Sequence, residues 1–389
     1  MTKKVRISLY IVSLVITTAV LVLVIFNEKM IRPAGSQNAN QQTNGQVNTE
    51  VNENNQIENG TEEEDTVKKP GKEEDGRGET TTIIFAGDVM LASGMEQFYD
   101  TEGVGGLLSE ELLEEMRNAD ICMVNNEFQF STRGTPMEDK QFTFRTDPKH
   151  VQMLLDMGVD IVSLANNHTI DFGTEALQDT FTTLDDAGIL YAGAGNSKER
   201  AEELQIIEVN GLKFGFLAAT RVIPVSQWNV EYRQPGLFAT YDDTRLVECI
   251  EEARAECDFL TVYVHWGVER EAYPQDYQTA IAKNCFEAGA DLVIGAHPHV
   301  LQGIEFIDGK PVFYSLGNYI FAQTIARTAL VKVEVQANGE ATYSLIPAYA
   351  EDGQTKLFEG ETGVELYDYM NEISPRAFID EMGNIYDIE

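Results

Sequence analysis

Short apolar runs alternate with amphipathic segments along the chain after residue 80. The runs have the length and composition of β-strands, and in the segments that follow them apolar residues recur at helical spacing. The apolar runs cover residues 83–86, 121–124 and 161–164, and the helical segments cover 109–118, 147–158 and 174–188. This alternation of strands and helices predicts an α/β fold.

Turn-forming dipeptides predict β-hairpins in the second half of the chain. Each lies between two β-type runs, and we interpret each as a two-residue turn. They are Asn210-Gly211, Asp308-Gly309 and Asn338-Gly339. Helices expected over 242–257 and about 275–288 alternate with two further strands between the first two hairpins. This mixture predicts two packed sheets with helices outside, in one large domain over residues 80–350.

Residues 1–32 form a predicted N-terminal membrane anchor. Ile7–Phe26 hold 20 residues without a charge after three basic residues, which is about enough to cross a bilayer. We interpret this segment as a membrane span or an uncleaved signal, because the pattern lacks the features of a cleaved signal peptide. The prediction is a single-pass protein of the cell membrane whose C-terminal domain lies outside the cytoplasm.

The two remaining segments are acidic and poor in pattern. Residues 33–79 contain almost no large apolar side chain, so we predict a disordered linker. Residues 351–389 form a predicted C-terminal acidic extension, in which residues 360–389 are expected to be either a docked helix or a frayed tail.

The formal net charge of −36 falls mostly on residues 80–389. A folded domain this acidic repels nucleic acid and anionic lipid surfaces, so neither is an expected partner. An anionic substrate would have to be held locally, by a metal ion or by arginine.

Four cysteines are present, and an even number outside the cytoplasm would permit two disulfides. They are Cys122, Cys249, Cys257 and Cys285. Their apolar surroundings favour buried free thiols instead, because a free cysteine behaves as a small core residue.

Polar clusters follow five of the predicted strands. In open α/β sheets, functional sites form at the carboxyl ends of the strands, so these side chains are expected to converge on one crevice. The candidate ligands are Asp88, Glu127, Asn167, His265, His297 and His299. His297 and His299 lie two residues apart around Pro298, so the loop must turn to aim both imidazoles at one centre.

Two carboxylates, an amide oxygen and three imidazoles suit manganese, iron, cobalt or zinc better than calcium or magnesium. The set is large enough for one or two divalent ions. The alternative is that some histidines are hydrogen-bonded interior residues. His168 could act as a general acid or donate to a developing oxyanion, with Asp171 orienting it. His150 falls outside the pattern, and we interpret it as a surface or capping residue.

Three further residues are candidates for substrate binding or support of the site. Arg145 could grip a carboxylate or phosphate, or it could be a surface residue. Glu269 could support an imidazole or be a solvated charge. Asn318 could cap a loop beside the metals or only turn the chain.

Six motifs occur in an order that resembles the CapA-type capsule-synthesis proteins linked to poly-γ-glutamate. They are GDVML, NNEF, ANNHTIDFG, HWGVE, GAHPHVLQG and YSLGNYIF. That family is similar to the calcineurin-like metallophosphoesterases, and the resemblance covers roughly residues 80–350. A single membrane span before an extracytoplasmic domain also resembles the membrane-bound members of the family.

The resemblance implies a four-layer α/β/β/α sandwich with a two-metal site. It implies that Asp88 is a terminal ligand and that Glu127 bridges the metals. Asn167, His265 and His297 would bind one metal, His299 would bind the other, and His168 would be catalytic. These roles are implied only by the match of the six motifs to those of the family.

Two positions depart from the superfamily pattern. Met90 stands where the first motif has a histidine, and Asn125-Asn126-Glu127 stands where the second motif has GDxxD. One metal position therefore has one ligand fewer, which bears on phosphoesterase activity more than on metal binding.

The leading functional hypothesis is a metal-dependent hydrolase or transferase outside the membrane, acting on an anionic polymer such as poly-γ-glutamate or on a phosphorylated intermediate. The alternative is a non-catalytic, metal-containing subunit that works with membrane-bound subunits of a capsule polymer synthesis and export complex. A surface glycosidase with paired carboxylates is a third hypothesis, but it would leave the imidazoles idle.

Overall fold

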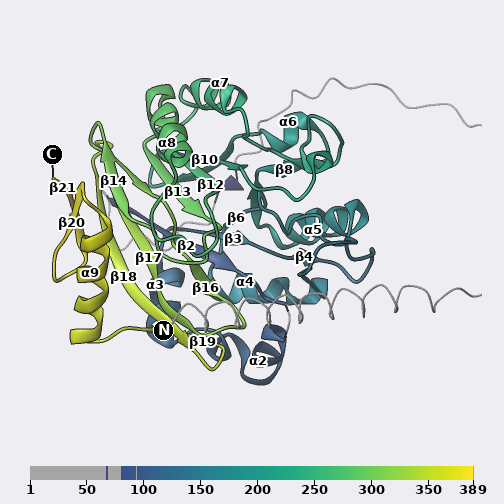
Figure 1. Cartoon of the computed structure of the whole chain (residues 1–389), viewed down its shortest axis with the longest axis horizontal. Coiled ribbons are helices and arrows are strands. Elements are labelled where there is room, and N and C mark those ends of the chain that lie inside the picture. The colour runs from purple at the N-terminus through teal and green to yellow at the C-terminus, as the bar shows by residue number, and fades with distance from the viewer. Residues whose placement is uncertain (1–66, 69–79, 93, 389) are drawn as a thin grey trace, which may run out of the picture. The chain divides into compact units, whose positions relative to one another are not determined.

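The computed structural model describes residues 67–68, 80–92 and 94–388 (Figure 1). The predicted membrane segment Ile7–Phe26 lies outside the described residues, as does all of the predicted linker except Val67–Lys68. Those two residues form strand β1, which pairs in parallel with β9 (Gln205–Val209). Within the described part of the chain, no helix has the length and apolar character to cross a membrane.

The larger sheet has ten strands. Its central strands β2, β3, β6 and β7 are parallel, and β17 and β18 continue the sheet in antiparallel pairing from β2. Its members are β2 (Thr80–Val89), β3 (Ile121–Asn126), β6 (Ile161–Ser163), β7 (Leu190–Ala192), β16 (Asn318–Ile320), β17 (Ile325–Gln336), β18 (Ala341–Glu351), β19 (Gln354–Leu357), β20 (Ala377–Ile379) and β21 (Asn384–Asp387).

The second sheet has seven strands, in the order β1-β9-β10-β12-β13-β15-β14. The inner strands β10, β12, β13 and β15 are parallel. Besides β1 it contains β9 (Gln205–Val209), β10 (Leu212–Thr220), β12 (Phe259–His265), β13 (Leu292–Ala296), β14 (Ile304–Ile307) and β15 (Lys310–Phe313). Two short pairs lie apart: β4 (Gln129–Phe130) with β5 (Arg145–Thr146), and β8 (Ala194–Gly195) with β11 (Gly236–Leu237).

Three predicted helix boundaries, at Asp147, Gly158 and Gly188, show the expected capping chemistry. The Asp147 side chain accepts a hydrogen bond from the Lys149 N–H at 3.0 Å, and Gly158 and Gly188 end helices in the left-handed conformation. The α-helices are α2 (Met95–Glu102), α3 (Glu110–Asn118), α4 (Gln152–Met157), α5 (Thr174–Ala187), α6 (Lys198–Ala201), α7 (Thr244–Ala253), α8 (Asp276–Ala288) and α9 (Glu361–Ile373). Single 3₁₀ turns are η1 (Gly103–Gly106), η2 (Pro148–Val151) and η3 (Ser226–Trp228).

Three hydrophobic clusters separate the layers. One lies between the two sheets, where Phe85 of β2 faces Phe216 of β10. A second joins the outer face of the larger sheet to α3, α4 and α5, and a third joins the outer face of the smaller sheet to α7 and α8. Strands buried on both faces read as continuous apolar runs, which is why the sequence revealed them. The predicted mixed α/β fold is confirmed.

Two of the three hairpin predictions are correct in detail. Asn210-Gly211 and Asp308-Gly309 connect their strands directly. All four φ angles are positive: 53° at Asn210, 80° at Gly211, 52° at Asp308 and 75° at Gly309. The third is wrong in length, because β17 ends at Gln336 and β18 begins at Ala341, so a longer connection surrounds Gly339. The single positive φ there, 84° at Gly339, fits a longer turn.

The end of the chain is a docked helix followed by a hairpin. The α9 residues Leu366 and Met370 lie in the cluster between the sheets, and β21 pairs with β18 of the larger sheet. The four cysteines are free and buried, as predicted. His150 is buried inside the turn η2, whose capping residues are Asp147 and Gln152, so its interpretation as a surface or capping residue is wrong. Its Nδ1 lies 2.7 Å from the Thr146 hydroxyl.

Candidate metal centre

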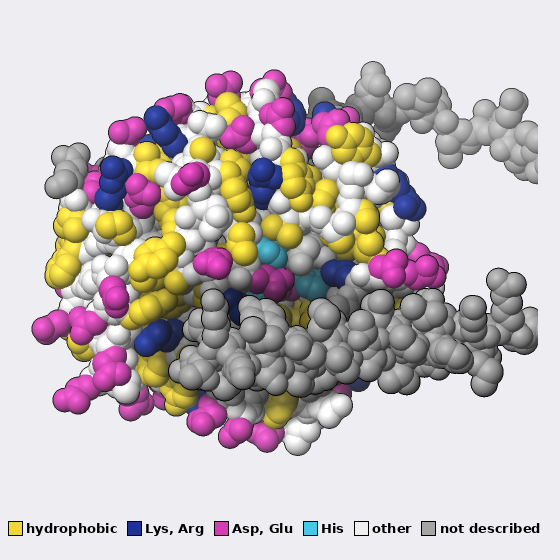
Figure 2. All heavy atoms as spheres, in the orientation of Figure 1, with side chains coloured by type: hydrophobic (Ala, Val, Ile, Leu, Met, Phe, Trp, Pro, Cys, Tyr) yellow, Lys and Arg dark blue, Asp and Glu magenta, His cyan; other side chains and the backbone are white. Residues whose placement is uncertain are grey.

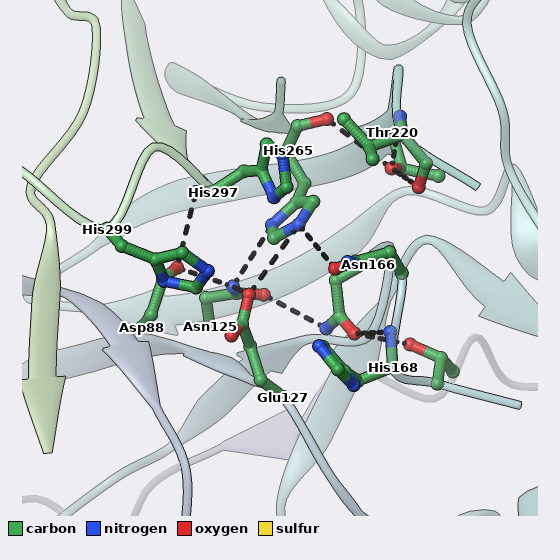
Figure 3. A network of polar contacts seen from close by, with 12 residues as sticks. Asp88, Asn125, Glu127, Asn166, His168, Thr220, His265, His297 and His299 are labelled. Atoms are coloured by element: carbon green, nitrogen blue, oxygen red, sulfur yellow. Dashed lines mark hydrogen bonds and ion pairs between the residues drawn. The ribbon is translucent and has the colours of Figure 1, made fainter. Parts of the chain in front are cut away.

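The candidate ligands lie where the carboxyl ends of strands from both sheets face each other (Figure 3). Asp88 is near the end of β2 and pairs with Asn125 of β3, and Glu127 follows β3 directly. His265 is the last residue of β12, and His297 follows β13. The convergence predicted from the strand ends is therefore present for these residues.

Asp88, Glu127 and His265 form the centre of the cluster. One ligand atom from each lies within 4.8 Å of the others, and all three side chains are fully buried. The Asn125 amide nitrogen lies among them, 2.8 Å from Asp88 Oδ1, 3.2 Å from Glu127 Oε1 and 3.2 Å from His265 Nδ1. Asn125 thus holds the two carboxylates and the imidazole in one arrangement.

The other predicted ligands surround this centre. Asn167 Oδ1 lies 3.0 Å from His265 Nε2, and the His297 ring centroid lies 4.7 Å from that of His265. His299 Nδ1 lies 3.3 Å from Asp88 Oδ2. All six predicted ligands are therefore brought together.

The turn that aims the two neighbouring histidines uses unusual backbone conformations. His297 has a φ of 98° and His299 a φ of 60°. For a residue with a side chain such angles cost roughly 1–3 kcal/mol each, and they concentrate at functional sites. The strain brings imidazoles that a straight strand would separate to within 5.8 Å of each other, measured between ring centroids.

Some buried polar atoms in the cluster lack a hydrogen-bond partner among the described residues. They are Glu127 Oε2 and His297 Nδ1, and Asp88 Oδ2 has only its 3.3 Å ion-pair contact with His299. An unsatisfied buried carboxylate oxygen is costly unless a cation or donor meets it. Oxygen and nitrogen atoms of this kind suit a divalent transition metal, so the residues present fit such an ion.

Burial and mutual charge shift the pKa values of these groups strongly. Burial, and then the charge of Asp88, hold the pKa of Glu127 well above its usual range. Burial lowers the pKa of His297 to about 4 and that of His265 well below its ordinary value. For His299 the effect of burial is outweighed by Asp88, Glu127 and Asn318, which raise its pKa to about 10. Clusters of opposed shifts of this kind are typical of functional sites.

His168 and Asp171 form a hydrogen-bonded pair beside the cluster. His168 Nδ1 lies 2.8 Å from Asp171 Oδ2, as expected for an orienting carboxylate. Because a carboxylate only accepts, Nδ1 carries the proton in this pair and Nε2 is left to face other groups. Burial lowers the pKa of His168, which favours its neutral form.

Lys140 was missed by sequence reasoning. Its ammonium contacts the Asp171 carboxylate and the Asn167 carbonyl and lies 3.1 Å from His168 Nδ1. Lys140 lies in an irregular connection with no apolar pattern, so no local signal marks it. Asn125 was visible in the sequence beside Glu127, but nothing there revealed that its amide lies between the ligands.

Of the three candidates for substrate binding or support of the site, only Asn318 contacts a candidate ligand among the described residues. Asn318 Oδ1 lies 2.6 Å from His299 Nδ1 and so supports a candidate ligand. The Arg145 guanidinium donates to the carbonyls of Arg133 and Gly134, which ties it to its own loop. Glu269 is exposed, and no hydrogen bond or ion pair joins it to an imidazole among the described residues.

Comparison with known proteins identifies the family. Residues 82–323, more than half of the chain, match the bacterial capsule synthesis protein family PGA_cap. The chain belongs to this family. The resemblance found in the six motifs is confirmed, and the matched region contains every candidate ligand.

Relatives within capsule synthesis include the PGA biosynthesis protein CapA of Bacillus subtilis, which is 30% identical over 68% of this chain and 70% of its own. The capsule biosynthesis protein CapA of Bacillus anthracis is 28% identical over 72% of this chain and 69% of its own. A probable polyglutamine synthesis accessory protein of Mycobacterium tuberculosis is 26% identical over 63% and 75%.

Among solved structures, a hypothetical protein from Thermus thermophilus covers 70% of this chain and 100% of its own, with 17% identity and a TM-score of 0.43. The sulfate thiohydrolase SoxB of Thermus thermophilus covers 72% of this chain and 46% of its own, with 15% identity and a TM-score of 0.39.

Proposed function

We propose that this chain serves capsule polymer synthesis as a metal-dependent hydrolase or transferase. Its substrate would be an anionic polymer such as poly-γ-glutamate or a phosphorylated intermediate. The family and the capsule synthesis named for its Bacillus relatives support the role in capsule synthesis. The proposal includes one or two ions of manganese, iron, zinc or cobalt, and a metallophosphoesterase-like identity for the layered α/β fold.

The observation that carries the proposal is the convergence of two buried carboxylates and three imidazoles. Among their buried atoms, Glu127 Oε2 and His297 Nδ1 have no hydrogen-bond partner in the described part of the chain. A purely structural cluster would satisfy these atoms within the protein. Asp88, Glu127, Asn167, His265 and His297 would hold one ion, and His299 would be a ligand of a second position. A bound divalent metal would supply a Lewis acid and lower the pKa of a coordinated water.

The chain's own residues supply the proton chemistry. Asp171 accepts the Nδ1 proton of His168, which fixes the imidazole tautomer and leaves Nε2 to exchange a proton with substrate. Lys140 holds the other Asp171 oxygen and keeps a positive charge beside the pair. The ring of Phe144, with its centroid 4.6 Å from that of His168, covers the imidazole on one side and limits water there.

One observation favours the non-catalytic alternative. Met90 stands at the position where a second metal would need a ligand. Its side chain is buried in the hydrophobic cluster that joins the larger sheet to α3, α4 and α5. A site with one complete metal position would suit a structural or polymer-binding role as well as a catalytic one. In that case the chain would act as a metal-containing subunit among membrane-bound capsule synthesis subunits.

The decisive experiment measures metal content and turnover together. The purified full-length chain is expected to hold about one or two equivalents of a transition metal, and His297→Ala to lose most of it. His150→Ala is the matched control, since His150 is a buried histidine outside the cluster. A wild-type chain without transition metal would contradict the proposal.

His168→Ala separates the two functions. We expect it to retain metal while hydrolysis of a γ-linked glutamate oligomer or a model phosphoester falls by about 10²–10⁴-fold. Unchanged capsule output in cells carrying this variant would instead favour the non-catalytic subunit.

We also propose that residues 7–26 anchor the chain in the cell membrane, with the folded domain outside the cytoplasm. The uncharged segment Ile7–Phe26 supports this proposal. Protease added to intact cells should digest the domain, provided that no outer barrier keeps the protease from the cell membrane. Deletion of residues 1–32 should release the domain from the membrane fraction. Protection from protease would contradict the orientation.

A further inference from the structure

Arg221 begins the connection that follows β10, at the same strand ends as the candidate metal centre. Its backbone N–H donates to the His265 carbonyl at 2.8 Å, and the preceding Thr220 pairs with His265 in register. Figure 2 shows histidine and acidic side chains together on one face, with basic and hydrophobic side chains around them.

Two tyrosine rings hold the Arg221 guanidinium. Its central carbon lies 4.5 Å from the centroid of the Tyr241 ring and 4.9 Å from that of Tyr277. The Tyr241 hydroxyl accepts the Ile223 N–H at 3.3 Å, and the Tyr277 hydroxyl accepts the Gly267 N–H at 2.9 Å. Because both rings are anchored to backbone, the guanidinium is positioned before any ligand arrives.

This cage adjoins the turn that carries two candidate ligands. A methyl group added at Gly267 would lie 2.8 Å from Pro298 Cγ, so the backbone that holds Tyr277 packs against the turn from His297 to His299. An anion bound at Arg221 would therefore lie at the rim of the same site.

Arg221 lacks, in the described part of the chain, the carboxylate partner that five other arginines of the domain have. Among the described residues, no carboxylate lies within ion-pair distance of its partly exposed guanidinium, which donates no hydrogen bond. Arginines with a carboxylate partner are Arg133, Arg200, Arg245, Arg254 and Arg376. The guanidinium of Arg145, the candidate chosen from the sequence, is bound to its own loop.

We propose that Arg221 binds a carboxylate of an acidic polymer whose neighbouring unit lies at the metal centre. This inference rests on the proposed function, because it takes the cluster as the place where the polymer reacts. A planar guanidinium grips a carboxylate through two parallel hydrogen bonds, and the tyrosine faces pack against the methylene groups beside it.

The surroundings favour a carboxylate over a phosphate. The groups that hold the Arg221 guanidinium are two uncharged aromatic rings. One guanidinium matches the single charge of a carboxylate, whereas a phosphate dianion is usually met by several donors or charges.

Calorimetric titration of the purified full-length chain tests the inference, with a short γ-linked glutamate oligomer and inorganic phosphate as separate probes. Arg221→Ala should weaken oligomer binding roughly ten-fold or more, the effect of losing hydrogen bonds to a charged group. Arg221→Lys should keep only part of the oligomer affinity, because lysine retains the positive charge but cannot form the two parallel hydrogen bonds of a guanidinium. Arg233→Ala, the same charge change at an exposed arginine of the same connection, should bind like wild type.

Three results of this titration would contradict the inference. Equal oligomer binding by wild type and Arg221→Ala, no binding by wild type, or Arg221-dependent binding of phosphate alone would overturn it. Metal content separates this inference from the proposed function, since Arg221→Ala should keep the wild-type stoichiometry. Arg221-dependent binding by a chain that holds no metal would refute the proposed function and leave the carboxylate site standing.

Discussion

Lys140 and Asp171 form the ion pair on which the His168 side of the site depends. The Lys140 side chain is 12% exposed and that of Asp171 is fully buried. Asp171 also accepts the Phe144 N–H at 2.8 Å, so this one carboxylate ties a loop, an ammonium and an imidazole together. Removal of the ammonium would leave a buried charge without its partner.

We therefore expect Lys140→Met to lower the free energy of unfolding by about 3 kcal/mol, the cost of breaking a buried pair. Lys149→Met is the control, because the Lys149 side chain is 62% exposed in its pair with Asp100, and its loss should cost less than about 1 kcal/mol. Urea unfolding followed by circular dichroism measures both. Equal stability of the two variants would show that the pair does not hold the site together.

The thiols provide a second test at the residue scale. Burial raises the pKa of Cys249 to about 12 and that of Cys257 to about 11, and raises that of Cys285 further. The thiolate is the reactive form, so at pH 8 we expect almost no reaction of the folded chain with a thiol reagent. All four thiols should react after unfolding in denaturant, and fewer than four would reveal a disulfide.

At the scale of elements, the site depends on close approach between strands and the loops that follow them. Gly295 of β13 lies just before the histidine turn, and a methyl group added there would come within 2.1 Å of the Tyr314 carbonyl oxygen. It would also lie 2.5 Å from the Trp266 indole nitrogen, which donates to that same carbonyl. The glycine is needed for space at the point where β13 delivers its ligands.

Gly295→Ala should therefore destabilise the domain by about 1–3 kcal/mol or more, since a methyl group inserted into a packed core forces the backbone to shift. Gly105→Ala is the matched control, because no atom lies within 4 Å of its added methyl group and its φ is not positive. Thermal unfolding compares the two, and a Gly295→Ala chain as stable as the control would contradict the packing argument.

At the scale of the whole molecule, the last thirty residues belong to the same core as the strands that carry the ligands. Ile373 of α9 lies in the cluster between the sheets, and the Ser374 hydroxyl accepts the Ile304 N–H at 2.8 Å. A methyl group at Gly303 would lie 2.1 Å from the Ile373 carbonyl oxygen, so this helix end touches the loop that follows His299.

A chain ending at residue 359 should therefore expose the core between the sheets and fail to fold cooperatively. Burial of a large aliphatic side chain stabilises by about 1.5–3 kcal/mol, and α9 contributes several. A chain ending at residue 387 should unfold like wild type, because it loses only exposed Ile388 and the final residue. The measurements are expression yield and thermal unfolding, and a stable chain ending at residue 359 would contradict the prediction.

The sequence by itself predicted the central strands β2, β3 and β6 with the helices that follow them, the free cysteines and the six residues that converge. Strands buried on both faces read as apolar runs, and ligands at strand ends read as polar residues after those runs, so both signals are local. The positions of Lys140, Asn125 and Arg221 were decided only by tertiary structure. Each acts through residues far away in sequence: Lys140 on Asp171, Asn125 on His265, and Arg221 between Tyr241 and Tyr277. Such pairings depend on how the two sheets and their loops pack, which no local pattern records.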